Sequence, residues 1–301
     1  MSKNKFEVII IGGSYAGLSA ALALGRSRRS VLVIDNGLPC NRQTPHSHNF
    51  LTHDGEKPAA IAEKARREMA NYKSVQILNE LANDGKKSDS GFEIHTKSGN
   101  IFQSKKLIFA TGLLDLMPAI EGFSECWGIS VVHCPYCHGY EFRDQKTGIL
   151  ANGEKAFHLS SLVSNLTDDI TILSSGNLDF SEAQKNKLKR QKVKINNQEL
   201  TEIVHDNGEI KEVVFKDGSR EIFAAIYAAI PFKQHSEIPA ALGCELTENG
   251  LIKVDSFQQT TVEGVYACGD NSGMRSVAHA VYSGGLAGAM INKSLTDEKW
   301  L

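Results

Sequence analysis

The sequence carries almost no net charge and no long uninterrupted apolar run. Its 33 basic and 35 acidic residues give a formal net charge of -2, without a block of like charges. A chain with this balance shows no excess or run of positive charge that would bind nucleic acid or an anionic membrane. The apolar stretch from Val8 to Leu24 is broken by Gly12, Gly13 and Gly17, so we interpret it as strand, turn and helix rather than a signal sequence. We expect a cytoplasmic protein whose partners are small molecules or proteins.

Cysteines are few, and only one pair has a spacing that suggests joint chemistry. The six are Cys40, Cys126, Cys134, Cys137, Cys244 and Cys268. A disulfide framework is therefore not expected. The chain also lacks a second CxxC or an HxxxH that could complete a zinc site, although His133 and His138 flank Cys134 and Cys137. We predict no metal, and we interpret His46, His48 and His53 as loop residues rather than ligands.

The chain is long enough for two domains, with 301 residues of which 41% are apolar and 23% charged. Near its start, the pattern predicts a strand at Glu7–Ile11, an Ala/Leu-rich helix at Ala16–Gly25 and a strand at Ser30–Asp35, which form a βαβ unit. Further elements are expected in the first part: a helix over Lys57–Tyr72, a hairpin over Phe92–Phe102 and a buried strand over Lys106–Thr111.

The same order recurs in the middle of the chain. Gly148–Ala151, Lys155–Asn165 and Asp169–Leu173 again predict strand, helix and strand. The expected elements that follow are a hairpin over Lys211–Ile222 turning on Asp217 and Gly218, strands at Phe223–Ile230 and Gly264–Cys268, and a small-residue helix over Ser276–Asn292. We therefore predict an α/β fold with two Rossmann-like, doubly wound domains.

The first turn has the pattern of a dinucleotide-binding site. Gly12 to Gly17 reads G-x-S-x-x-G, in which serine replaces the middle glycine, and Asp35 ends the next strand. Gly12 permits a tight turn, Gly17 permits close helix packing, and the amides of the helix N-terminus can bind a pyrophosphate. A carboxylate at Asp35 can accept a hydrogen bond from a ribose hydroxyl. Without Asp35, a glycine-rich turn of any α/β protein would be an equal interpretation.

Cys134, Pro135, Tyr136, Cys137 and His138 form a CxxCH cluster. Two thiols this close in sequence close a disulfide with little loop entropy, so the bond stabilises the fold little and is better interpreted as a two-electron store. Pro135 suits the first turn of a helix, whose positive end would lower the pKa of a cysteine thiol. CxxCH also matches c-type haem attachment, but no axial ligand or export address supports haem.

Four motifs together resemble those of the low-molecular-weight thioredoxin reductases. They occur in the family's order over nearly the whole chain: Gly12 to Gly17, Ala110-Thr111-Gly112, the CxxC and Ala267-Cys268-Gly269-Asp270. The resemblance implies an FAD domain built from residues 1–115 and 244–301, an NAD(P)-binding-like domain at residues 116–243 that carries the CxxC, and a homodimer. It also implies that Cys137 faces the flavin and that Cys134 exchanges with substrate.

The same resemblance implies where FAD binds. The pyrophosphate would lie over the first turn, the adenosine ribose at Asp35 and the ribityl chain near Asp270, with Arg42 and Asn49 in a flavin-contacting segment. The full set of expected cofactor contacts is Gly12, Gly13, Ser14, Ala16, Gly17, Asp35, Arg42, Asn49, Ala110, Thr111, Gly112, Gly269, Asp270, His279 and Ala280.

Two histidines depart from the thioredoxin reductase pattern. His138 stands where that family carries an acidic residue, and an imidazole there could transfer the thiol proton. His279 begins the helix that, by resemblance, directs its amides at the flavin. Histidines at both places resemble the dithiol oxidases that close the disulfides of gliotoxin and holomycin. Capping or packing is an equal interpretation for His279.

The second nucleotide site is degraded. Ala151 to Ala156 lacks the first glycine, Glu154 would repel phosphates, and Leu173 is followed by Ser174, Ser175 and Gly176 with no arginine. We therefore expect weak or no NADPH or NADH use by an FAD-dependent dithiol/disulfide oxidoreductase, with Cys134, Cys137, His138 and His279 as catalytic residues. Two alternatives stay open: an NAD(P)H-dependent reductase of a thioredoxin-like protein, and a non-enzymatic flavoprotein redox sensor.

Overall fold

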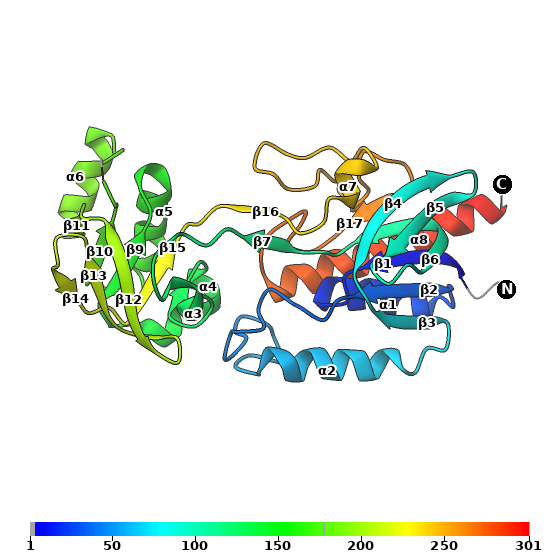
Figure 1. The fold of residues 1–301 in the computed structure, drawn as a ribbon, viewed down its shortest axis with the longest axis horizontal. Helices are drawn as coiled ribbons and strands as arrows, with labels where there is room; N and C mark the ends of the chain where they lie inside the picture. Colours follow the sequence, from blue (N-terminus) through cyan, green and yellow to red (C-terminus); the bar gives the residue numbers. More distant parts are fainter. Residues whose placement is uncertain (1–3, 177, 301) are drawn as a thin grey trace. The chain divides into compact units, whose positions relative to one another are not determined.

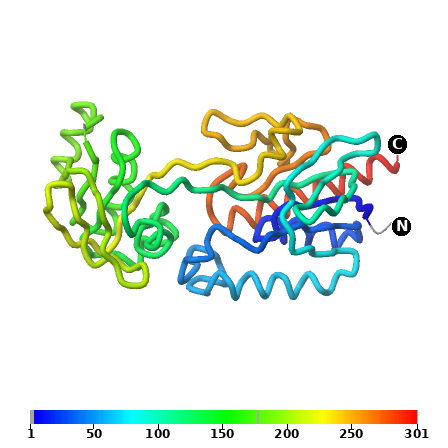
Figure 2. The backbone as a smooth tube through the Cα atoms, in the orientation of Figure 1, coloured from blue at the N-terminus to red at the C-terminus, as the bar shows by residue number. Residues whose placement is uncertain are grey.

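The computed structural model describes residues 4–176 and 178–300, which fold into two compact units. Unit 1 comprises Met1–Arg42, Phe50–Leu114 and Lys233–Leu301, and unit 2 comprises Gln43–Asn49 and Asp115–Phe232. Short strands β7 (Leu113–Asp115) and β16 (Phe232–Gln234) pair with each other where the chain leaves unit 1 and returns to it (Figure 2).

Unit 1 is built on a seven-stranded sheet in the order β3-β2-β1-β6-β5-β4, with β17 also paired to β6. The strands are β1 (Lys5–Ile11), β2 (Val31–Asp35), β3 (Val75–Asn79), β4 (Ala82–Ser88), β5 (Gly91–Thr96), β6 (Ile101–Phe109) and β17 (Val265–Ala267). Pairing is parallel from β3 through β1 and β6 to β17, whereas β4, β5 and β6 pair antiparallel. The carboxyl ends of the parallel strands therefore meet at one edge.

Helices cover both faces of this sheet. They are α1 (Tyr15–Arg26), α2 (Pro58–Met69), α7 (Ile238–Ala241) and α8 (Val277–Trp300). Because side chains alternate along β1, Val8 and Ile10 pack with α1 and α8, while Ile9 and Ile11 join the core that includes α7. Figure 1 shows α1 and α8 side by side. A Cβ on Gly284 would lie 2.0 Å from the Ala16 carbonyl oxygen, so this close crossing requires glycine.

Unit 2 has a parallel five-stranded sheet in the order β11-β10-β9-β15-β8 and an antiparallel three-stranded sheet, β12-β13-β14. The strands are β8 (Val131–Val132), β9 (Thr147–Leu150), β10 (Ile170–Leu173), β11 (Lys194–Asn196), β12 (Leu200–Asp206), β13 (Glu209–Phe215), β14 (Arg220–Glu221) and β15 (Ala225–Ala228). The helices are α3 (Phe123–Cys126), α4 (Pro135–His138), the 3-10 turn η1 (Tyr140–Phe142), α5 (Gly153–Val163) and α6 (Glu182–Arg190).

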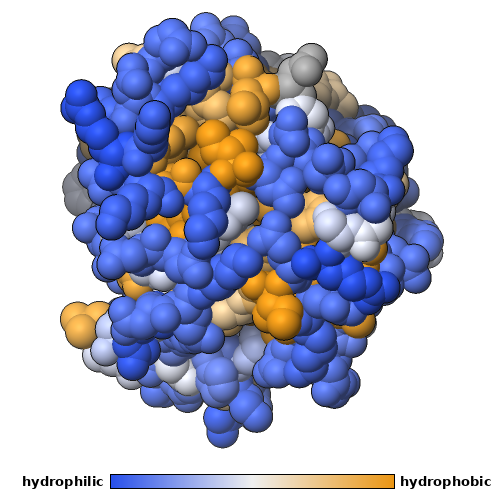
Figure 3. Space-filling model, turned by 90° about the vertical axis from the view of Figure 1, so that its left-hand side faces the viewer, coloured by the Kyte–Doolittle hydropathy of each residue, from blue (hydrophilic) through white to orange (hydrophobic). Residues whose placement is uncertain are grey.

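The surface is mostly hydrophilic on the side drawn in Figure 3, with hydrophobic side chains gathered in small areas. Within the described part of the chain, no helix combines the length and hydropathy needed to cross a membrane.

The predicted α/β class with two parallel-sheet, Rossmann-like cores is confirmed. The predicted hairpins are also present, as β5–β6 and as β13–β14 with Gly218 in the turn at φ +84°. The predicted end of the last helix is wrong, because α8 continues to Trp300. Strands β4 and β12 were not predicted, and each completes an antiparallel pair.

Candidate active site

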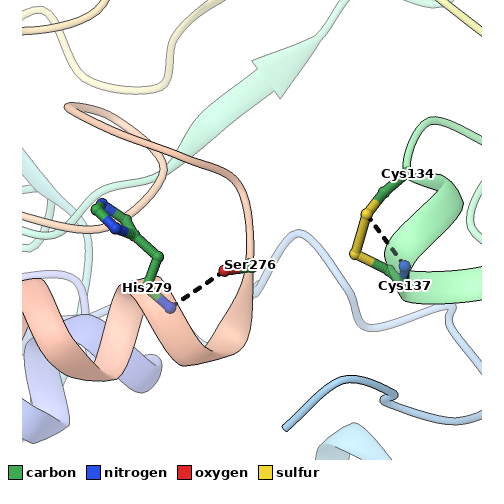
Figure 4. The surroundings of a disulfide bond; sticks show 4 residues. All are labelled: Cys134, Cys137, Ser276 and His279. Carbon is green, nitrogen blue, oxygen red and sulfur yellow. Dashed lines mark hydrogen bonds between the residues drawn. A yellow bond between two sulfur atoms is a disulfide. The ribbon is translucent and has the colours of Figure 1, made fainter. Parts of the chain in front are cut away.

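Cys134 and Cys137 form a disulfide with their Cα atoms 5.3 Å apart, at the start of α4 (Figure 4). Pro135 occupies the first turn of this helix, as predicted. The Cys137 backbone N–H donates to Cys134 Sγ at 3.1 Å. In the reduced protein this bond would favour a thiolate on Cys134, because a hydrogen bond to the charged form stabilises it. Since α4 has a single turn, this local N–H matters more than a helix dipole.

His138 ends the same short helix. Burial lowers the pKa of its imidazole, an effect that the nearby Glu141 carboxylate opposes and that His48 reinforces. A lowered pKa keeps the ring neutral at neutral pH, which is the form that can accept a proton from a thiol. The geometry of unit 2 thus brings together a disulfide and a base.

The glycine turn between β1 and α1 lies against the end of β6. Gly12 has φ +103°, and a Cβ there would lie 2.2 Å from the Ala110 carbonyl oxygen. A Cβ on Gly17 would lie 1.9 Å from the Gly12 carbonyl oxygen. Ser14 precedes α1 in an extended conformation and makes no side-chain capping bond. The Ser14 side chain therefore does not cap α1, and a helix N-terminus favours an anion.

Asp35 is buried at the carboxyl end of β2, beside this turn. Its Oδ2 accepts from Arg66 Nη2 of α2 at 2.6 Å. A Cβ on Gly13 would lie 2.8 Å from Asp35 Cβ, so the carboxylate is held directly against the turn. One carboxylate oxygen is committed to Arg66, and the other can serve a ribose hydroxyl.

The turn after β17 approaches the same edge of the sheet. Gly269 has φ +83°, and its N–H donates to Ser283 Oγ of α8 at 3.0 Å. The next residue, Asp270, accepts through Oδ2 from the Cys40 thiol at 3.6 Å. The Ala267-to-Asp270 motif is thereby fixed to α8 on one side and to the segment after β2 on the other.

Two side-chain amides, of the buried Asn271 and the half-buried Gln234, lie close to the Ala267-to-Asp270 motif. Asn271 Nδ2 donates to the Phe109 carbonyl at 2.9 Å and to Thr111 Oγ1 at 3.2 Å. Gln234 Nε2 donates to the carbonyls of Gly250 and Asn271, each at 2.9 Å. Because a carbonyl only accepts, these bonds define which way each amide points. Asn271 Oδ1 and Gln234 Oε1 have no hydrogen-bond partner among residues 4–176 and 178–300. Two buried acceptors at this edge are suited to a ligand that carries hydroxyl or N–H donors.

His279 lies in the first turn of α8, and Figure 4 shows its backbone N–H directed at Ser276 Oγ, 3.1 Å away. Ser276 is therefore the capping residue, and the His279 side chain does not cap the helix. A Cβ on Gly273 would lie 2.2 Å from His279 Nε2, so the ring packs against that glycine. Its catalytic role stays a prediction.

The corresponding turn of unit 2, between β9 and α5, is closed by the chain's own groups. Asn152 Oδ1 accepts from the N–H of Gly153 at 2.8 Å and from that of Asp179 at 3.1 Å. The space beside Gly153 is occupied by Asp179, whose Oδ2 would lie 3.2 Å from a Cβ there. Glu154 stands in the first turn of α5 and accepts from Gln184 Nε2 at 2.6 Å.

The model of the pyridine nucleotide-disulphide oxidoreductases matches residues 6–284. The chain belongs to this family. It is 35% identical over 312 residues to thioredoxin reductase tcpT of Claviceps purpurea, covering 98% of this chain and 95% of the relative. An oxidoreductase from Agrobacterium tumefaciens has a similar crystal structure, with a TM-score of 0.91, 36% identity and coverage of 97% and 99%. The structure of HlmI is also similar, with a TM-score of 0.92, 30% identity and coverage of 98% and 94%.

Membership in the pyridine nucleotide-disulphide oxidoreductases confirms the predicted family and an FAD-dependent thiol-disulfide oxidoreductase. The family implies FAD and a nicotinamide nucleotide. The residues present in unit 1 fit FAD, since the glycine turn before the N-terminus of α1 suits a pyrophosphate, Asp35 a ribose, and the unpaired oxygens of Asn271 and Gln234 suit donors such as the ribityl hydroxyls.

The roles of individual residues stay predictions. Arg42 is exposed in unit 1, where its Nη1 donates to the Pro39 carbonyl, while Asn49 is exposed in unit 2 with φ +58°. Within the described residues, no cluster of His, Cys, Asp and Glu is arranged to hold a metal ion.

Sequence reasoning missed several residues that the structure places at these sites: Arg66, Glu141, Asn152, Asp179, Gln234 and Asn271. Asn271 had a usable signal, since it directly follows the Gly269-Asp270 motif. The others reach their sites through long-range packing or local side-chain geometry that no motif encodes.

Proposed function

We propose that this enzyme oxidises a dithiol. Electrons pass from the substrate to the Cys134–Cys137 disulfide, then to FAD, and finally to oxygen or another acceptor, without a nicotinamide nucleotide. The observation that carries this proposal is the closed turn at the start of α5, where Asn152 Oδ1 already accepts from the Gly153 and Asp179 amides.

A dinucleotide does not fit this turn. Its pyrophosphate would need free amides at the start of α5, whereas Asn152 Oδ1 accepts from the Gly153 amide there and also ties the Asp179 amide of the segment after β10 to the turn. The carboxylates of Glu154 and Asp179 flank the turn and would repel phosphate. Beyond β10, the chain continues with Ser174 and Ser175 and supplies neither the cation that a 2′-phosphate needs nor the carboxylate that a ribose needs.

The disulfide chemistry follows thiol exchange. A substrate thiol gives its proton to the neutral His138 imidazole, and the resulting thiolate attacks Cys134 Sγ, so that the S–S bond breaks and Cys137 leaves as a thiolate. The second substrate thiol gives its proton to the Cys137 thiolate, attacks the substrate sulfur of this mixed disulfide and releases Cys134 as a thiolate. The products are a cyclic substrate disulfide and two reduced cysteines. Bound FAD supplies the next acceptor of the electron pair.

Anaerobic titration of the purified yellow protein tests the proposal. We expect that a small dithiol bleaches the flavin at stoichiometric amounts, and that NADPH and NADH do not bleach it at the same amounts. Dithionite serves as the control that the flavin is competent, and Cys134→Ser as the control that the dithiol acts through the disulfide. Rapid bleaching of the wild-type flavin by stoichiometric NADPH would refute the proposal.

The alternative is a nicotinamide-dependent reductase of a thioredoxin-like protein. It is favoured by the names of relatives, which are called thioredoxin reductases. The same titration separates the two functions, because this alternative requires NADPH or NADH to reduce the flavin and a thioredoxin-like protein to reoxidise it. A non-enzymatic redox sensor is not proposed for a member of an enzyme family.

We also propose a cytoplasmic homodimer, on the basis of the resemblance to low-molecular-weight thioredoxin reductases. Light scattering on the purified holoenzyme measures the mass directly. A monomer mass of 32.9 kDa would contradict the dimer.

A further inference from the structure

A loop from the N-terminal part of the chain packs against the CxxCH region of unit 2. Gln43 Nε2 donates to the Ser124 carbonyl at 3.3 Å, and Thr44 Oγ1 lies 3.2 Å from where a Cβ on Gly128 would be. Four residues further on, His48 Nε2 lies 3.5 Å from Glu141 Oε1. This loop therefore delivers a histidine to a carboxylate that follows the redox cysteines.

Glu141 follows His138 by three residues along one short helical stretch, in which Gly139 between α4 and η1 also has αR backbone angles. Glu141 lies in η1, which follows α4 after Gly139, and side chains three residues apart on a helix are neighbours. The Glu141 side chain is 39% exposed and that of His48 is 21% exposed, so the pair is partly shielded from water. Glu141 raises the pKa of the His138 imidazole, and His48 lowers it.

We propose that Glu141, which also pairs with His48, is a positioning residue that stabilises the protonated imidazole of His138 while it carries the thiol proton. The inference rests on the proposed function, in which the substrate S–H gives its proton to His138 and leaves a thiolate. The proton is conserved in this step: the thiol loses it, the imidazole becomes an imidazolium, and the Glu141 carboxylate lies beside the new charge.

The other ionisable groups around this cluster do not replace Glu141. Tyr227 rises from β15 beneath α4, with its Oη 3.1 Å from where a Cβ on Gly139 would be. Burial raises the pKa of Tyr227, so the phenol stays neutral. His46 belongs to the same loop as His48, and the centroids of the two rings lie 6.4 Å apart. Glu141 is the carboxylate that acts on both His138 and Tyr227.

The test is a pH titration of the His138 ring by NMR in oxidised holoenzyme carrying 13C-labelled histidine, with the signal assigned from His138→Gln. Glu141→Gln should lower the pKa of His138, because the carboxylate that favours the charged ring is gone. His48→Gln should raise it, because His48 lowers the pKa of His138 and its removal also releases Glu141 from the pair. Glu182→Gln, which removes an exposed carboxylate on α6, should leave the titration unchanged.

Opposite shifts in the two variants support the proposal, since a purely structural role predicts no such pair of signs. An unchanged His138 titration in Glu141→Gln, or shifts of the same sign in both variants, would overturn it. If either variant fails to fold, the direction of the shift in the pKa of His138 in the other variant still decides.

The proposed function is tested separately, because the NMR titration needs no substrate. In anaerobic stopped-flow measurements, Glu141→Gln should slow flavin reduction by a dithiol about threefold to tenfold. It should also move the acidic limb of the pH–rate profile to lower pH. If no dithiol reduces the flavin, the oxidase proposal fails while the titration result stands. If the dithiol reacts but the limb does not move in Glu141→Gln, the positioning role fails.

Discussion

Replacing Asp35 with asparagine tests where the adenosine end of FAD binds. The side chain keeps its shape and an acceptor oxygen but loses its charge. A hydrogen bond to a charged group contributes about 1.5–3 kcal/mol, against about 0.5–1.5 kcal/mol for a neutral one. The difference of about 1–2 kcal/mol corresponds to an FAD dissociation constant about 5-fold to 30-fold higher.

The measurement is FAD binding to deflavinated protein, followed by the quenching of flavin fluorescence. Arg66 would lose its charged partner in Asp35→Asn, but its side chain is 40% exposed, so the free energy of unfolding of the apoprotein should fall by no more than about 1 kcal/mol. Asp297→Asn, which breaks an exposed ion pair with Lys293 on α8, is the matched control and should bind FAD normally. An Asp35→Asn affinity within twofold of the wild type would refute the assignment of Asp35 to the ribose.

Two further predictions concern the cysteines. Cys137→Ser should form a mixed disulfide on Cys134 when it is offered the disulfide form of the substrate, because the Cys134 thiolate attacks that S–S bond and no Cys137 thiol remains to release the adduct. The added substrate mass is seen in the intact protein, and an adduct on any other cysteine would contradict the assignment. In the oxidised native protein, alkylation at pH 8 should modify the exposed Cys40 and spare the buried thiols, because burial raises the pKa of Cys126 to about 11 and that of Cys268 to about 12. Peptide mass spectrometry measures this, and labelling of a buried thiol at the rate of Cys40 would contradict it.

The first turn could be predicted because the local backbone has no room for a Cβ at two of its positions, so only glycine fits there. Gly12 and Gly17 are needed where a Cβ would meet a backbone oxygen, and such demands leave a fixed spacing in the sequence. The Asp35–Arg66 pair could not be predicted, since it depends on how α2 packs beside β2. The same holds for Gln234, which reaches Asn271 from the strand that re-enters unit 1.

Strand β4 shows why local patterns failed elsewhere. Its sequence, ANDGKKS, has no β-branched or aromatic residue and contains Gly85 in the middle. Antiparallel pairing with β5 supplies the hydrogen bonds, and the side chains of Ile94 and Ile238 occupy the space next to Gly85. Tertiary packing therefore overrides a weak propensity. The last helix was predicted too short for a related reason. The small residues that define the pattern lie where α8 contacts α1, but α8 continues beyond this contact into a last turn of charged, exposed residues.

The two glycine turns of the chain diverge in a way that bears on the source of electrons. The start of α1 has no side-chain cap from Ser14, whereas the start of α5 is capped by Asn152 and flanked by Glu154 and Asp179. Removing one of these features would not restore a nucleotide site, because the capped Gly153 amide, the two carboxylates and the missing cation after β10 each act against binding on their own. We therefore expect Glu154→Ala to leave the flavin unreduced by NADPH in the anaerobic titration. Bleaching by NADPH in this variant would mean that one carboxylate had been the whole barrier, and that the capped turn does not exclude the nucleotide.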